Sequence, residues 1–299
     1  MKKRLELKGI LFIVLTALCW GPSFAFIKTA LSDFAPLTIT FCRIFLGFLV
    51  FYLICRVKGL SLWKRRSSWK HYAILGFLFN IAPIILISYS EKQISSSLAG
   101  IMNSFALIFT AILSHFFVPG GKLSMKRTLG IGIGIIGLVI IYLPMLLKGR
   151  ENKEIGVWLM IAATAFYGMG SVYARTHLKK DPGIVVLAFQ LGLASLILFP
   201  FMLGIDQPFS NATPALASVL SLIGLGVIGS AGGFLFYYKA IDFSGPMFAS
   251  LALLLVPIFA MIIGIAFMGD HFVWTTYLGV ACIFGGILLV HPILQPKSK

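Results

Sequence analysis

Charged side chains are scarce in this sequence. Only 11% of its 299 residues are Asp, Glu, Lys or Arg, whereas 59% are hydrophobic. Soluble domains carry roughly 25% charged residues, so this chain has too few solvated side chains to cover the surface of a soluble globule. Acidic residues are the scarcer sign, with 9 against 25 basic residues. The composition excludes an ordinary soluble domain and indicates a protein that crosses the bilayer many times.

The motifs of enzymes and metal sites are missing as well. The four cysteines, Cys19, Cys42, Cys55 and Cys282, lie inside apolar runs without CxxC spacing, so we interpret them as small buried apolar residues. No nucleophile–base pair, HExxH motif or carboxylate dyad stands out, and we expect no enzyme activity, no cofactor and no metal. The formal net charge of +16 comes from basic residues in short loops, so nucleic acid is not an expected partner.

Apolar runs of about 20 residues, the length needed to cross the hydrocarbon layer, recur ten times. They predict an all-α polytopic membrane protein. The expected spans are 9–28, 36–55, 71–90, 95–117, 128–147, 156–175, 183–203, 215–238, 244–268 and 274–291. The first run has a basic start but no small-residue cleavage site, and it is therefore interpreted as a membrane helix instead of a removed signal peptide.

Lysine and arginine predict the orientation. The N-terminus, alternate loops and the C-terminus hold 19 of the 25 basic residues, the opposite side holds 5, and Arg43 lies within a span. Cytoplasmic loops carry the excess of basic residues in bacterial-type membrane proteins. We therefore expect a multi-pass protein of the cytoplasmic (inner) membrane with both termini in the cytoplasm.

The sequence also contains an internal repeat. Lys92 and Lys239, Asn103 and Ser250, and Lys28 and Arg175 are each 147 positions apart, as are Trp20-Gly21 and Tyr167-Gly168. Five helices form one unit and five is odd, so the second unit enters the membrane from the opposite side. The prediction is ten transmembrane helices in two inverted five-helix repeats, residues 1–147 and 148–299.

Several stretches resemble the EamA family of the drug/metabolite transporter superfamily. They are WGPSFAFIKTAL, PLTITFCRIFLGFL and LGIGIGIIGLVIIYLP in the first half, and YGMGSVYARTHL, SGPMFASLALLLVPIFAMIIGIAFMGD and LGVACIFGGILLVHP in the second. The resemblance implies two inverted halves with a central cavity, and transport of a small organic metabolite such as an amino acid. Gln190 stands where the first repeat has Arg43, so the role of that arginine is not duplicated.

Polar helix faces predict which residues line such a cavity, because polar groups must be sheltered from lipid. Trp20, Ser23, Phe24 and Lys28 share one face of the first helix, and Gly21-Pro22 makes a hinge plausible there. Pro83 interrupts the hydrogen-bond ladder of the third helix. The expected cavity residues are Trp20, Ser23, Phe24, Asn80, Asn103, Tyr167, Ser171, Tyr237 and Ser250. The competing interpretation of such faces is aromatic packing between helices.

Charged residues near helix ends are candidates for gates. Lys28, Glu91 and Lys92 are expected outside, and Arg175, Lys239 and Asp242 inside, and we hypothesise that the two clusters close alternately. Ordinary solvation at the interface is the competing explanation. Arg43 lies about 10 Å into its helix, so it either extends to the interface or finds polar partners or substrate.

The glycine-rich motif at residues 132–137 can be interpreted as a dinucleotide site or as a helix-packing contact. Residues 132–137 match GxGxxG, which in dinucleotide sites follows a strand in an aqueous crevice. Here the motif lies inside an apolar run, and glycines at such spacing allow close helix packing. We therefore predict helix packing and no nucleotide.

The function predicted is a monomeric secondary transporter that exports a small amphipathic metabolite by alternating access. Aromatic cavity residues suit a substrate with apolar parts. The alternatives are a metabolite uptake or exchange carrier of the same fold, for a nucleoside- or cofactor-like solute, and, less in keeping with the sequence, an intramembrane enzyme. A channel would show rings of one residue type and an oligomer, whereas the inverted repeat favours a carrier.

Overall fold

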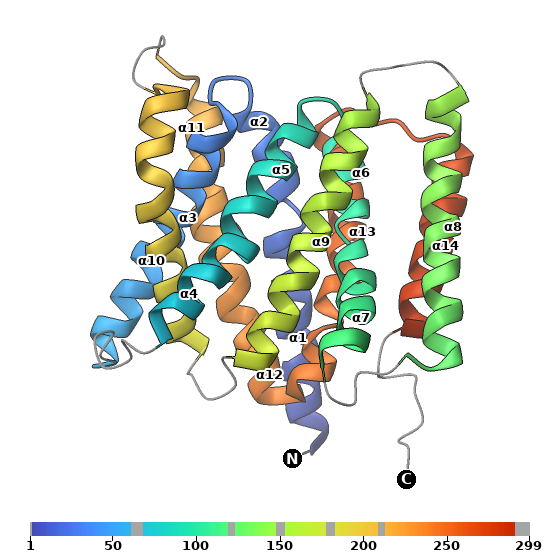
Figure 1. The fold of residues 1–299 in the computed structure, drawn as a ribbon, viewed down its shortest axis with the longest axis horizontal. Coiled ribbons are helices and arrows are strands. Elements are labelled where there is room, and N and C mark those ends of the chain that lie inside the picture. Colours follow the sequence, from blue (N-terminus) through green and yellow to red (C-terminus); the bar gives the residue numbers. More distant parts are fainter. Residues whose placement is uncertain are drawn as a thin grey trace.

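A computed structural model describes residues 2–60, 68–118, 123–147, 153–177, 183–208 and 213–290. Throughout these ranges the regular structure is helical, and the helices stand side by side across one thick layer (Figure 1). Seven helical stretches are long and apolar enough to cross a membrane, and two shorter apolar helices, Ala252–Phe267 and Trp274–Leu289, accompany them. This confirms the all-α polytopic fold.

The helices group into ten consecutive spans. The first repeat contains α1 (Lys2–Trp20) with α2 (Ser23–Ala30), α3 (Pro36–Val57), α4 (Trp69–Gly76) with the π-helical η2 (Phe77–Ile81) and α5 (Ala82–Glu91), α6 (Ser96–Met102) with α7 (Phe105–Phe117), and α8 (Met125–Leu147). The second contains α9 (Lys153–His177), α10 (Gly183–Phe201) with η3 (Met202–Asp206), α11 (Leu216–Gly224) with η4 (Leu225–Gly232) and α12 (Gly233–Ala249), α13 (Ala252–Phe267), and α14 (Trp274–Val290). The last turns of α12 lead directly into the fourth span, which α13 completes.

Both repeats break their fourth span at equivalent residues. Between α6 and α7 the N–H groups of Ala106 and Leu107 donate to the carbonyls of Asn103 and Ser104, three residues back. Between α12 and α13, Leu253 and Leu254 donate in the same way to Ser250 and Leu251. The residues at the first break and their counterparts at the second are 147 positions apart. The internal repeat is therefore present in the backbone as well as in the side chains.

The third spans of the two repeats share π-helical turns, η2 and η4. In the first repeat the cause is local. Pro83, the second residue of α5, has no N–H to offer the carbonyl of residue 79, so the turn before it widens. The first span breaks at Gly21-Pro22, as expected, whereas α9 continues unbroken through the equivalent residues.

One boundary differs from the sequence-based expectation. A turn was expected between residues 238 and 244, but α12 is helical from Gly233 to Ala249. Residues 239–243 contain no glycine or proline, and the Gly245-Pro246 pair that follows lies within α12 and does not end it. The equivalent turn in the first repeat is enforced by Ser95, which has an extended backbone and accepts a hydrogen bond from Leu98 N at 3.3 Å.

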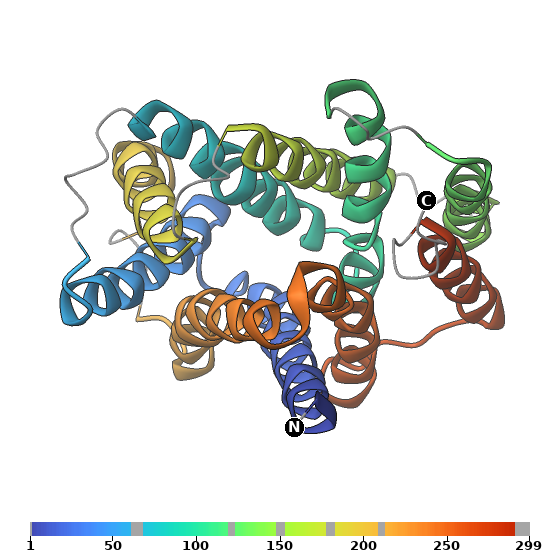
Figure 2. The same cartoon turned by 90° about the horizontal axis from the view of Figure 1, so that it is seen from below.

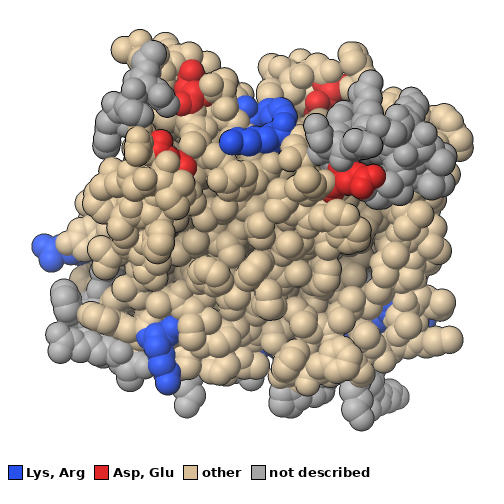
Figure 3. Space-filling model, turned by 45° about the horizontal axis from the view of Figure 1, so that its top comes forward, with Lys and Arg blue, Asp and Glu red and all other residues tan. Residues whose placement is uncertain are grey.

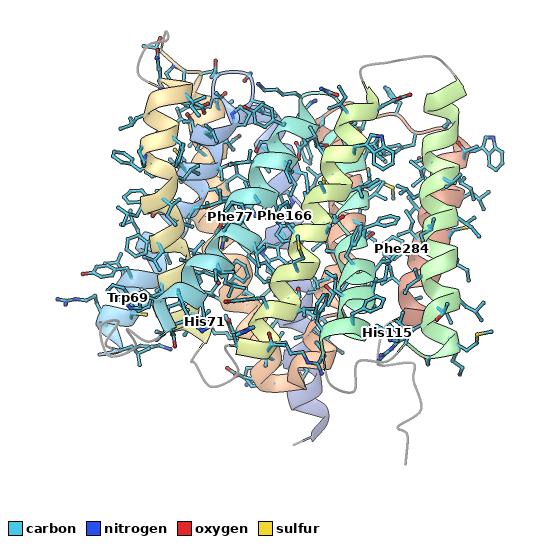
Figure 4. All side chains as sticks on the ribbon, viewed as in Figure 1. Trp69, His71, Phe77, His115, Phe166 and Phe284 are labelled. Carbon is cyan, nitrogen blue, oxygen red and sulfur yellow. The ribbon has the colours of Figure 1, made fainter. Side chains whose placement is uncertain are left out.

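The surface and the interior have the polarity that lipid requires. Large apolar side chains cover the outside, for example Leu53 (60% exposed), Leu196 (70%) and Phe116 (71%). Several polar side chains, including Thr40, Ser97 and Thr164, are fully buried. Figure 4 shows the labelled Trp69, His71 and His115 toward the lower end of the bundle and Phe77 and Phe166 at mid-height. Amphipathic rings near one end suit a membrane interface.

The fifth spans of the two repeats, α8 and α14, pack together at one side of the bundle (Figures 1 and 2). Their backbones touch through glycines. A Cβ on Gly137 would lie 2.6 Å from the carbonyl oxygen of Gly279, and one on Gly286 would collide with the carbonyl oxygen of Gly130. The GxGxxG sequence thus serves helix packing, as predicted, inside a membrane-length helix.

Candidate functional site: a central cavity between the two repeats

A cavity of about 330 Å³ lies between the repeats. Eight of the nine residues expected to line it do so: Trp20, Ser23, Phe24, Asn80, Asn103, Tyr167, Ser171 and Ser250. Tyr237, the ninth, is absent from the lining, and its ring packs against that of Trp20 with 5.5 Å between centroids. Their role in substrate binding is taken up below as a proposal.

The polar cavity residues sit where helices lose their regularity. Trp20 ends α1 before the Gly21-Pro22 break, Asn80 and Ser230 lie in the π-helical turns η2 and η4, and Asn103 and Ser250 lie at the paired breaks. Interrupted helices are tolerated inside a membrane only where protein or a cavity satisfies the freed backbone groups. Local breaks therefore place polar groups around the cavity from both repeats.

Aromatic rings form two walls. Trp20 and Phe234 meet edge to face with centroids 5.4 Å apart, and Phe79 and Tyr167 meet at 5.9 Å. Trp20 and Tyr167 are equivalent in the repeat, whereas Phe79 and Phe234 correspond to Gly226 and Ile87 at the same offset, so each wall has one ring of its own. Sequence reasoning missed Phe79 and Phe234, since neither breaks an otherwise apolar pattern. The space between the walls suits an apolar or aromatic group of a ligand.

Arg43 also lines the cavity. Its Nε donates to the hydroxyl of Ser230 on η4, with 3.4 Å between the atoms. The contact joins the two repeats, since Arg43 belongs to α3. The interpretation of Arg43 as a residue that extends to the membrane interface does not describe this structure, because the side chain faces the interior.

The upper end of the bundle in Figure 1 is tied together by hydrogen bonds. Lys28 Nζ donates to the carbonyl oxygens of Glu91 and Ile94, at 3.0 Å for Ile94. Between the repeats, Ser90 Oγ donates to the carbonyl of Gly156 at 2.6 Å, and Ser97 N donates to Asp270 Oδ2 at 3.2 Å.

Two further carboxylates bind helix starts at this end. Asp206 Oδ2 accepts from Thr38 N at 2.7 Å and from Thr38 Oγ1 at 3.0 Å, which caps the beginning of α3. Asp33 accepts from the hydroxyl of Ser218 and, at 3.2 Å, from the N–H of Ala215 before α11. Figure 3 shows acidic side chains around a basic patch on this face.

The lower end has fewer such links between its helices. There α1 packs on α12 and α13, whereas α4 and α7 pack on α9, and the view from below shows these groups as two rows (Figure 2). Within the second row, His71 Nδ1 and the hydroxyl of Tyr173 share a hydrogen bond of 2.7 Å. The described hydrogen bonds therefore join the helices around the cavity more at the upper end than at the lower.

The charged residues proposed as gates lie at the two ends but form no ion pairs within the described ranges. Lys28 binds carbonyl groups instead of the Glu91 carboxylate, whose two oxygens are buried without a hydrogen-bond partner among the described residues. Lys92 lies over the ring of Tyr89 and Lys239 over that of Phe12, each 5.3 Å from the centroid. Arg175 and Asp242 are exposed. A gating role for these residues stays a prediction.

Comparison with known proteins gives one consistent result. The sequence profile of the EamA-like transporter family matches residues 7–143 and again 154–291. An uncharacterized transporter of Bacillus subtilis is 23% identical over 94% of this chain and 96% of its own. A probable terminal-alkyne amino-acid exporter of Streptantibioticus cattleyicolor is 20% identical, over 95% of this chain and 93% of its own.

A solved crystal structure, 18% identical, covers 100% of both chains with a TM-score of 0.66, which supports the same fold. The profile match spans nearly all of the sequence and divides it into two halves that correspond to the two sets of five spans. This chain belongs to the EamA-like transporter family.

Proposed function

We propose that this transporter exports a small amphipathic organic metabolite through the central cavity by alternating access. The observation that carries the proposal is the cavity itself, which both repeats line with aromatic rings and polar groups. Inverted repeats around a midplane site are the architecture in which rocking of the helices exposes one site to each side in turn. The Streptantibioticus relative, a probable terminal-alkyne amino-acid exporter, supports the direction and an amino-acid-like substrate.

The proposal includes an orientation. The lower end carries most of the described basic residues, among them Lys58, Lys70, Arg127 and Arg175, which the positive-inside rule assigns to the cytoplasm. Both chain ends then lie in the cytoplasm, and the hydrogen-bonded upper end is the external side. The structure corresponds, in this proposal, to a state closed toward the outside. The functional unit is a monomer of two repeats, 1–147 and 148–299, in the cytoplasmic membrane; residues 148–152, at the junction, lie outside the described ranges.

Transport into inside-out and right-side-out vesicles tests the function. A panel of amino acids and related metabolites is offered on either side, and uptake is followed by mass spectrometry. For an exporter we expect the substrate to accumulate in inside-out vesicles when a driving gradient is imposed. For an uptake carrier we expect the substrate to accumulate in right-side-out vesicles.

A matched pair of variants connects transport with the cavity. Leu107 lines the cavity, so Leu107→Trp places an indole in it and is expected to abolish transport. Leu196 on α10 is 70% exposed on the lipid-facing surface, so Leu196→Trp is expected to transport normally. Equal transport by both variants would show that the substrate takes another route.

A further inference from the structure

The electrostatics of the cavity are dominated by one group. Arg43 is the one formally charged side chain among the lining residues that the structure describes. Its described interactions are the 3.4 Å hydrogen bond from Nε to Ser230 and electrostatic attraction to Tyr167 and Glu91, and it forms no ion pair with any described residue. An arginine inside a membrane protein is costly unless polar or anionic partners compensate it. A ligand that binds in the cavity can supply that compensation.

The anion most compatible with this environment is a carboxylate. A guanidinium presents a planar fork of donors that matches a carboxylate with two parallel hydrogen bonds. The Ser230 hydroxyl, beside Arg43, supplies a further donor. A phosphate monoester carries up to two negative charges, and no second Lys or Arg lines the described cavity to balance it.

Two amides in the cavity wall each have one atom without a hydrogen-bond partner among the described residues. The Nδ2 of Asn80 and the Oδ1 of Asn103 are buried without a hydrogen-bond partner among the described residues, and both side chains line the cavity. Buried polar atoms are nearly always satisfied, so such groups in a cavity wall indicate a polar ligand. Together they offer one donor and one acceptor, which suits a substrate with a second polar group near its carboxylate.

The repeat makes this polarity one-sided. Gln190, the equivalent of Arg43, is buried at 3% exposure and does not line the cavity. Trp20 and Tyr167, by contrast, are equivalent in the repeat and both line the cavity, each in contact with a further ring. A ligand is therefore oriented by its charged group at Arg43, while its apolar part lies between rings.

Resting on the proposed function, we infer that the substrate is a small carboxylate with an apolar or aromatic body, and that Arg43 with Ser230 binds the carboxylate. The inference defines the head group of the transported molecule and its orientation in the cavity.

Four probes of one shape test the inference. 3-Phenylpropionate, 3-phenyl-1-propanol, 3-phenylpropylamine and 2-phenylethyl phosphate share a phenyl ring on a short alkyl chain and differ in head group. Their binding to the purified protein in detergent is measured by isothermal titration. We expect the carboxylate to bind at least about 10-fold tighter than the alcohol, since hydrogen bonds to charged groups carry that much energy. The amine is expected to bind more weakly than the alcohol.

Variants of Arg43 assign the preference to that side chain. Arg43→Gln should weaken carboxylate binding by about 10- to 100-fold and leave alcohol binding within about 3-fold. Arg43→Lys keeps the positive charge without the planar fork of donors, and its affinity for the carboxylate should lie between those of the parent and Arg43→Gln. Arg56→Gln is the matched control, because Arg56 lies exposed at the other end of the same helix. Thermal unfolding of each variant verifies that it folds.

The outcomes separate this inference from the proposed function. Equal or tighter binding of the alcohol, the amine or the phosphate, no binding of the carboxylate at millimolar concentration, or a preference that survives Arg43→Gln would overturn the carboxylate inference. Leu107→Trp reports on the cavity alone. If it blocks binding of every probe while no head group is preferred, the cavity remains the binding site and only the carboxylate is wrong. If the probes bind to Leu107→Trp unchanged, the cavity is not the site and both proposals fail.

Discussion

Replacing Lys28 by methionine should open the hydrogen-bonded upper end of the bundle. The methionine keeps much of the length and apolar body of lysine but removes the ammonium, which donates to the carbonyl oxygens of Glu91 and Ile94. Glu91 is the last residue of α5, where unsatisfied helix carbonyls favour a cation. The contact links α2 to the end of α5 and the turn before α6, directly above the cavity.

The size of the effect follows from these two bonds. A hydrogen bond to a charged group contributes about 1.5–3 kcal/mol, and Lys28 regains some hydration when the end opens. A net change of about 2–3 kcal/mol shifts the ratio of closed to open states by about 30- to 150-fold. The bonds of Ser90, Ser97, Asp33 and Asp206 remain, so the protein should still fold.

A second substitution distinguishes a closure made by hydrogen bonds from Lys28 to carbonyl groups from one made by an ion pair between Lys28 and Glu91. The Glu91 carboxylate is fully buried and has no hydrogen-bond partner in the described ranges, although Lys28 and Arg43 attract it. Burying a carboxylate costs several kcal/mol unless hydrogen bonds satisfy its oxygens. Glu91→Gln should therefore stabilise the closed end. If the closure instead depended on a side-chain ion pair between Lys28 and Glu91, both substitutions would open it.

A reporter cysteine measures the result. Leu107→Cys lies in the cavity wall, and the four native cysteines are replaced by serine or alanine to remove background labelling. A membrane-impermeant maleimide is applied to right-side-out vesicles. Lys28→Met should label much faster than the parent and Glu91→Gln more slowly. Unchanged labelling in Lys28→Met, or faster labelling in both variants, refutes the carbonyl closure.

Three further outcomes follow from the same structure. Gly137→Ala should lower the free energy of unfolding by about 1–3 kcal/mol, because its Cβ would lie 2.6 Å from the Gly279 carbonyl oxygen. Gly132→Ala, whose Cβ would have no atom within 4 Å, should be neutral or stabilising. Thermal unfolding compares the two variants, and equal effects would contradict the glycine-mediated packing of α8 on α14. Asp206→Ala should lower the free energy of unfolding by about 1–2 kcal/mol, because it removes the cap of α3. Thr38→Val should lower it less, because the hydrogen bond from Thr38 N to Asp206 remains. A larger loss of stability in Thr38→Val, measured by thermal unfolding, would rule out the cap as the main contribution. Cysteines near Lys153 and Asp206 should react with an impermeant reagent from outside and one near Arg65, which lies outside the described ranges, should not; labelling near Arg65 in intact cells would reverse the orientation.

Several features of this protein could be predicted from the sequence because they depend on local or repeated chemistry. Whether a segment enters the membrane depends on its own transfer free energy, so ten apolar runs predicted the spans before any packing was known. The offset of 147 residues predicted the inverted halves and paired Asn103 with Ser250, and the structure shows that the helices break at both residues. The glycines of residues 132–137, inside an apolar run, indicated a helix contact.

The tertiary structure decided which side chains meet. The sequence placed Lys28 near Glu91. Only the packing of α2 directs the Lys28 ammonium to carbonyl oxygens, and the Glu91 carboxylate has no hydrogen-bond partner among the described residues. Tyr237 shares a polar face with cavity residues, yet the rotation of α12 packs its ring on Trp20. The contact of Arg43 with Ser230 joins residues 187 positions apart. Helix rotation and separation are set by the interdigitation of many side chains at once, which a periodic pattern along one helix does not encode.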